Sequence, residues 1–171
     1  MILSIVVAAS ENNAIGLKGE LLWRLPKDTQ FFKEVTWGHH VLMGRKSWEA
    51  LPPKYRPLEG RTNIVVTRQT DYNAEGAKVV ATVEDGIQFA KDAGEEELMI
   101  IGGGEIYKHV YPIIDKAYIT RVHAVFDEAD AFLPEFNMNE WTITNDVHQP
   151  VDEKHKYSFD ILTMERKRQQ P

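Results

Sequence analysis

Short runs of apolar residues alternate along the chain with stretches in which apolar residues recur at helical spacing. A short apolar run bounded by glycine, proline or polar residues is typical of a buried strand. We therefore predict strands at residues 2–9, 41–43, 63–67, 98–101 and 117–123. Helical spacing predicts a helix that begins at Pro26, and further helices at residues 45–51, 83–93 and 105–111.

The C-terminal part of the chain has a different pattern, because apolar and polar residues alternate in 141–147 and 157–164. Such alternation predicts a pair of antiparallel strands. Strands that alternate with helices imply a mainly parallel sheet covered by helices. We therefore predict an α/β fold for residues 1–171 as a single domain. Its central sheet should be mixed and mainly parallel, with flanking helices and an antiparallel C-terminal strand pair.

The composition narrows the classes of function. With 43% hydrophobic and 27% charged residues, the chain reads as an ordinary soluble globular protein. It has no cysteine, which excludes disulfides and thiolate chemistry. No apolar run approaches the roughly 20 residues that a membrane span needs, so we expect a cytoplasmic protein without membrane contact. The net charge of −6 argues against a nucleic-acid partner.

Histidines and basic residues add little by themselves. His39 and His40 are adjacent and should point apart, and the other histidines are isolated in the sequence, so no metal site is expected. No G-x-S-x-G motif supports a hydrolase. The basic residues 166–168 are expected to form a solvated tail.

Asp28 is a carboxylate on the apolar face of a predicted helix, three and four residues before Phe31 and Phe32. An ionised carboxylate on a buried face is costly unless something pairs with it. It could simply complement the helix dipole. However, it follows a glycine-containing loop, residues 15–23, which ends in a tryptophan. The combination indicates one wall of a small-molecule site.

Two strand-to-helix junctions are rich in glycine or basic residues, at 43–47 and 101–107. Helix N-termini present unpaired N–H groups, and glycines let a ligand approach the backbone, so both junctions could hold phosphate. Neither matches the Rossmann or Walker pattern, and a tight turn remains the alternative at 102–104. Surface solvation is likewise the alternative for Arg45, Arg61 and Arg68.

Taken in order, these motifs resemble dihydrofolate reductases over essentially the whole chain. The motifs that carry the resemblance are Ile15-Gly16, Leu21-Leu22-Trp23, Asp28, Phe32, Thr36, Met43-Gly44-Arg45, Gly60-Arg61, Asn63-Ile64, Ile101 to Gly104, Tyr107 and Thr120. The resemblance implies reduction of 7,8-dihydrofolate to 5,6,7,8-tetrahydrofolate with NADPH in one-carbon metabolism. It also implies a monomer, and a target for antifolate inhibitors.

The resemblance implies roles for individual residues. Asp28 would hold the pterin and assist protonation at its N5 atom through water, with Trp23 and Thr120 completing the catalytic group. Substrate would contact Val6, Val7, Ala8, Asp28, Phe32, Leu51, Leu58, Arg61, Ile101 and Tyr107. NADPH would contact Ala8, Ile15, Gly16, Gly19, Leu21, Gly44, Arg45, Lys46, Ser47, Thr67, Arg68, Ile101, Gly102, Gly103, Gly104, Glu105, Ile106 and Tyr107. A cis peptide bond is expected at Gly103–Gly104.

Three features depart from the family pattern: Leu22 in place of a proline, Glu105 near the expected cofactor phosphates, and a longer 52–57 loop. Two rival functions stay open. A pyrimidine reductase of riboflavin synthesis would share the NADPH site but lack the pairing of Trp23 with Asp28. A non-catalytic nucleotide-binding domain would keep the fold with a degenerate site.

Overall fold

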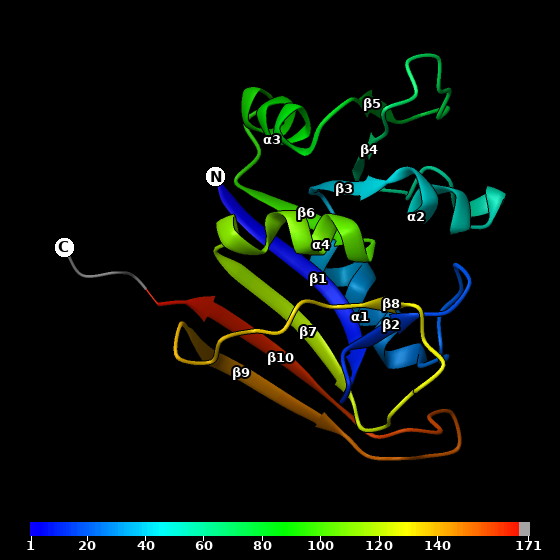
Figure 1. Ribbon diagram of the computed structural model, residues 1–171, viewed down its shortest axis with the longest axis vertical. Coiled ribbons are helices and arrows are strands. Elements are labelled where there is room, and N and C mark those ends of the chain that lie inside the picture. The colour runs from blue at the N-terminus through cyan, green and yellow to red at the C-terminus, as the bar shows by residue number, and fades with distance from the viewer. Residues whose placement is uncertain (168–171) are drawn as a thin grey trace.

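The central sheet has eight strands in the order β5-β4-β3-β6-β1-β7-β10-β9 (Figure 1). This computed structural model describes residues 1–167. The strands are β1 (Ile2–Ser10), β2 (Ala14–Gly16), β3 (His40–Gly44), β4 (Thr62–Val66), β5 (Lys78–Val80), β6 (Glu97–Gly102), β7 (Lys116–Val122), β8 (Ala131–Phe132), β9 (Trp141–Gln149) and β10 (Phe159–Arg166). The helices are α1 (Pro26–Thr36), α2 (Arg45–Ala50), α3 (Val83–Asp92), α4 (Gly104–Val110) and the short 3₁₀ helices η1 (Pro53–Tyr55) and η2 (Tyr111–Ile113).

The strand directions confirm the predicted fold class. The six strands from β5 to β7 in the sheet order run parallel to one another, and β10 pairs antiparallel with both β7 and β9. The described residues therefore form a single α/β domain with a mixed, mainly parallel sheet. That this domain extends from residue 1 to residue 171 stays a prediction. Among the described helices, none is long and apolar enough to cross a membrane.

The middle of the sheet is buried on both faces, and alternate residues of β1 point to opposite sides of it. Ile5 and Val7 belong to a core cluster that includes residues of α3 and α4, such as Val110. Val6 belongs to a second cluster, against which Phe32 of α1 packs. Helices on both sides therefore hold the carboxyl ends of the parallel strands in fixed positions, where ligands of open α/β sheets usually bind.

Helix α1 begins at Pro26, as predicted, and proline is well suited to the first helical position. A residue far away in the sequence also caps its N-terminus, since the backbone N–H of Lys27 donates a hydrogen bond of 3.1 Å to His155 Nε2. Asp152 Oδ1 lies 2.8 Å from the other ring nitrogen of His155. The sequence gives no signal for this contact, which fixes the start of the helix that carries Asp28.

The expectation of a solvated basic tail is wrong for Arg166. This residue is the last of β10, and its guanidinium lies 4.5 Å from the centre of a Trp141 ring. Its Nε also donates to the backbone oxygen of Ile114 at 2.8 Å. The expectation failed because the long apolar stem and planar guanidinium of an arginine can cover an aromatic surface. Arg168 lies outside the described residues.

Candidate active site

The side chain of Asp28 points to the sheet. Thr120 Oγ1, in β7, donates a hydrogen bond of 2.6 Å to Asp28 Oδ1. Burial raises the pKa of Asp28 above its usual value, and the bond from Thr120 opposes this shift only in part. Thr120 is itself buried and sits opposite Ala8 of β1. A half-buried acid held by a strand residue is more than a complement to the helix dipole.

Two apolar clusters pack against the part of α1 that carries Asp28. The second core cluster contains most of the predicted substrate wall: Val6 and Leu58 are buried, and Phe32, Leu51 and Ile101 pack against them. A third cluster contains Trp23, Leu25, Val122, Phe159 and Ile161, with Ala8 and Leu22 packed on it. Phe31 contacts both clusters. The structure thus brings the predicted wall residues together around the first turns of α1.

The loop before α1 is fixed at its end and exposed at its tip. Trp23 is only 8% exposed and its ring lies 5.5 Å from that of Phe126. Leu22, the residue that replaces the expected proline, is half-buried against the same cluster. Leu21, in contrast, is 75% exposed. Gly19 has a φ of +80°, which glycine adopts without strain, in the turn at the tip.

The two predicted phosphate junctions face each other. Strands β3 and β6 are neighbours, with Met43 opposite Gly102. Helices α2 and α4 begin directly after these strands, so their N-termini lie side by side. A Cβ added at Gly103 would lie 3.3 Å from Ser47 Oγ, and one at Gly44 would lie 3.5 Å from Ile106. The glycines therefore let the two junctions pack closely against each other.

The cis peptide bond lies at Gly102–Gly103, so the expectation of Gly103–Gly104 is wrong by one residue. The reason is where the strand stops: β6 ends at Gly102 and Gly103 already caps α4. Gly102 has a φ of +120°, and a Cβ there would lie 3.1 Å from the Tyr107 hydroxyl. Tyr107 donates to the backbone oxygen of Val6 at 2.8 Å, and burial raises its pKa far above the usual value.

The Arg61 side chain is held in place beside the C-terminal end of α1. Its Nε donates to Glu59 O at 2.8 Å and its Nη1 donates to Thr36 Oγ1 at 3.1 Å. The guanidinium also lies 5.7 Å from the centre of the Trp37 ring. Partial burial lowers its pKa, yet an arginine stays charged at neutral pH. These contacts use two donors of the fork and leave the remaining N–H groups for an anion.

The basic residues at the junctions differ in their surroundings. Arg45 Nη1 lies 3.1 and 3.0 Å from the two carboxylate oxygens of Glu49, one helical turn later. Lys46 and Arg68 are exposed. Glu105 is exposed in the first turn of α4, where a negative charge interacts favourably with the helix dipole. An anionic ligand would therefore compete with Glu49 for Arg45 but would meet Arg68 directly.

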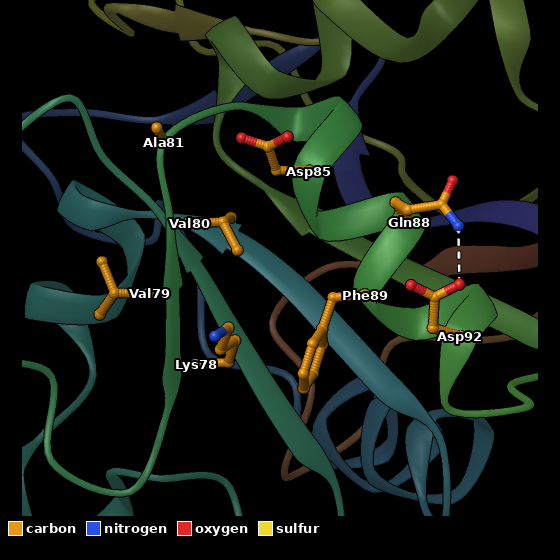
Figure 2. A pocket seen from close by; sticks show the side chains of 8 residues that line it. All are labelled: Lys78, Val79, Val80, Ala81, Asp85, Gln88, Phe89 and Asp92. Carbon is orange, nitrogen blue, oxygen red and sulfur yellow. Dashed lines mark hydrogen bonds between the residues drawn. The ribbon is translucent and has the colours of Figure 1, made fainter.

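A hollow between β5 and α3 contains none of the predicted site residues (Figure 2). In it, the Lys78 ammonium lies 5.4 Å from the centre of the Phe89 ring. Gln88 Nε2 donates to Asp92 at 2.7 Å, as the dashed line in Figure 2 marks. These polar groups pair with their own neighbours on the surface of a helix. The acid, the apolar walls and the paired helix N-termini make the surroundings of Asp28 the better candidate for a functional site.

A half-buried acid packed among apolar side chains, in a fold that also has two glycine-lined helix N-termini after neighbouring parallel strands, is typical of an α/β enzyme that uses a nucleotide cofactor. Comparison with known proteins identifies which one. The profile of the family described as dihydrofolate reductase matches residues 2–166. The dihydrofolate reductase of Bacillus subtilis is 36% identical over 165 residues, covering 96% of this chain and 95% of the relative. That of Haemophilus influenzae is 38% identical over 167 residues, covering 98% and 100%.

A solved structure agrees with this match. The dihydrofolate reductase from Enterococcus faecalis, complexed with NADP(H) and RAB-propyl, superposes with a TM-score of 0.88 at 37% identity. The match covers 98% of this chain and 97% of that structure. The chain belongs to the dihydrofolate reductase family. It is therefore an enzyme of folate metabolism that reduces dihydrofolate with NADPH.

Proposed function

We propose that Asp28 is the group that holds the pterin ring of dihydrofolate and directs a proton to its N5 atom. The bond from Thr120 to the half-buried Asp28 carboxyl is the observation that carries this proposal. It leaves Asp28 Oδ2 available to accept from the 2-amino group or N3 of the ring. Burial raises the pKa of this acid, so it stays protonated to higher pH than an ordinary aspartate and can serve as a source of the proton there.

The remaining roles follow from the geometry around Asp28. Trp23 closes the pocket from the loop side and orders the water through which a proton reaches N5. Val6, Phe32, Leu51, Leu58 and Ile101 hold the flat rings of the substrate by apolar contact. Arg61 binds the α-carboxylate of the glutamate tail, because charged hydrogen bonds to a guanidinium fork are strong and directional. Antifolate inhibitors with the same ring donors would use the same carboxyl.

The residues at the two helix N-termini fit a dinucleotide. NADPH, when bound, supplies the hydride. The backbone N–H groups at Gly44 to Ser47 and Gly103 to Ile106 would hold its phosphates, helped by the positive ends of α2 and α4. Ile15 would contact the nicotinamide, and its side chain lies 3.8 Å from a Cβ built at Gly104. The chain would act as a monomer without a nucleic-acid partner.

Preference for NADPH over NADH should depend on Arg45 and Arg68, which lie after neighbouring strands β3 and β4. In a protein of net charge −6, local cations must hold the extra 2′-phosphate. Changing both to alanine should reduce the preference by tenfold or more, since one charged hydrogen bond contributes about 1.5–3 kcal/mol. The ratio of kcat/KM for the two cofactors measures this.

The control replaces Lys91 and Lys154, two exposed cations outside the junctions, and changes the net charge equally. The control should keep the cofactor ratio and its salt dependence, whereas the arginine variant should lose both. An unchanged ratio in the arginine variant would place the 2′-phosphate elsewhere.

A further inference from the structure

Two histidines and an aspartate lie together at the end of the sheet where β7 and β9 finish and β10 begins (Figure 1). His148 sits directly opposite Asp160 in the β9–β10 pair. His123 follows β7, and its backbone N–H donates to Ser158 O, two residues before Asp160. One ligand atom from each of the three side chains lies within 4.8 Å of the others. Histidines that are isolated in the sequence are therefore neighbours in the fold.

Asp160 bonds to both imidazole rings. Its Oδ2 lies 3.0 Å from His123 Nε2 and its Oδ1 lies 2.7 Å from His148 Nδ1. His123 Nδ1 in turn lies 3.2 Å from Glu11 Oε1. An ionised carboxylate can only accept hydrogen bonds, and each of the two ring nitrogens of His123 faces one such acceptor. Two imidazoles and a carboxylate thus present electron-pair donors to one small region, which is an arrangement that a metal cation can bind.

The neighbouring arginine does not neutralise Asp160. Arg121 lies opposite Asp160 in the β7–β10 pair. Its Nη1, however, donates to Ser10 O at 2.7 Å and to Asn13 Oδ1 at 2.8 Å, toward the turn after β1. The carboxylate of Asp160 is therefore left to the two imidazoles.

We propose that His123, His148 and Asp160 form a binding site for a divalent cation of the zinc class, independent of the folate reaction. Two imidazoles and a carboxylate suit Zn²⁺, Ni²⁺ and Cu²⁺ better than Mg²⁺ or Ca²⁺. Around a tetrahedral zinc the ligand atoms would lie about 3.3 Å apart, given bond lengths of about 2.0–2.2 Å. The His148 side chain is 58% exposed, so its ring has room to adjust from its present 2.7 Å contact with Asp160 to this spacing.

Glu11 has a supporting role in this site. Its carboxylate faces the nitrogen of His123 that would not touch the metal. A ring N–H held in this way fixes which nitrogen faces the ion and strengthens it as a ligand. Replacing such a partner typically lowers metal affinity about 10- to 100-fold. The other coordination positions of the ion would be filled by water.

The test is calorimetric titration of the chelator-treated, full-length protein with zinc chloride. Wild type should bind one zinc ion per chain, and Cu²⁺ should bind more tightly than Zn²⁺. His148→Gln and Asp160→Asn should each weaken zinc binding at least tenfold, and Glu11→Gln about 10- to 100-fold. Zinc in excess should also raise the Tm of wild type, because an ion that binds only the folded state stabilises it.

His109→Gln is the matched control, because His109 lies 2.6 Å from Glu84 and, within residues 1–167, pairs with that one carboxylate. This variant should bind zinc as wild type does. Electron paramagnetic resonance of the Cu²⁺ complex should show two coupled imidazole nitrogens in wild type and one in His148→Gln. The proposal is overturned if wild type shows no saturable one-to-one binding. It is equally overturned if the His148 and Asp160 variants bind zinc with wild-type affinity.

Discussion

Replacing Asp28 by asparagine should reduce turnover with dihydrofolate at neutral pH by about 10²- to 10⁴-fold, the usual loss for a positioned acid or base. The amide keeps the size of the side chain and can still accept from Thr120, but it cannot hold the pterin as an anion or relay a proton. The loss should shrink at low pH, where substrate protonated at N5 forms without help. Near wild-type turnover at neutral pH would show that Asp28 does not have this role.

Stability measurements separate this effect from misfolding. Burial raises the pKa of Asp28 in the folded state above its value in the unfolded chain. The group therefore favours folding most at a pH below the unfolded pKa, and this contribution is lost as pH rises through the folded pKa. At neutral pH the Asp28→Asn protein should be at least as stable as wild type. A variant that is inactive and also much less stable would leave the loss of activity explained by unfolding.

Thr120→Val tests how the hydrogen bond from Thr120 affects the pKa of the Asp28 carboxyl. The hydrogen bond from Thr120 lowers the pKa of Asp28, against the larger effect of burial. Valine has a similar shape but no hydroxyl, so its substitution should shift the pH profile of turnover to higher pH while the acid remains. Asp28→Asn should instead remove the ionisation from the profile.

Replacing Arg61 by alanine should weaken dihydrofolate binding roughly 10- to 150-fold and leave NADPH binding unchanged. The expected loss corresponds to a charged hydrogen bond of about 1.5–3 kcal/mol. The fork is already oriented by Glu59 O and Thr36, so little order has to be gained on binding. Equilibrium fluorescence titration with each ligand measures both affinities.

A folate analogue without the glutamate tail gives the control. It should bind wild type and Arg61→Ala equally, because the missing carboxylate is the proposed partner. Arg61→Lys should restore only part of the affinity, since an ammonium cannot form the two parallel bonds of a guanidinium. If Arg61→Ala still discriminates between dihydrofolate and the analogue as wild type does, another residue holds the tail.

Much of this architecture could be predicted because it depends on local pattern. Buried parallel strands are apolar runs, and Asp28 stands out because it interrupts an apolar helix face. The glycines at 102–104 mark a close backbone approach. The short strands β2, β5 and β8, of three, three and two residues, were missed because so few residues show no periodicity.

Contacts between residues that are far apart in the sequence could not be predicted from it. His155 closes the start of α1 across a separation of 128 residues, and the cluster of His123, His148 and Asp160 needs the register of three strands. The pairing of Arg45 with Glu49 is different, because a spacing of four on a helix does indicate it. In the proposed cofactor site, a phosphate would have to displace Glu49 from Arg45.

The most direct test of the role of Asp28 is to follow its carboxyl carbon by ¹³C NMR during a pH titration, with and without bound folate. In the ligand-free protein the carboxyl should titrate above the usual range for aspartate, as its burial requires. With folate bound, its chemical shift and its titration should both change, because the carboxyl meets the pterin ring. A carboxyl that titrates at the ordinary value and does not respond to folate would contradict the proposed site.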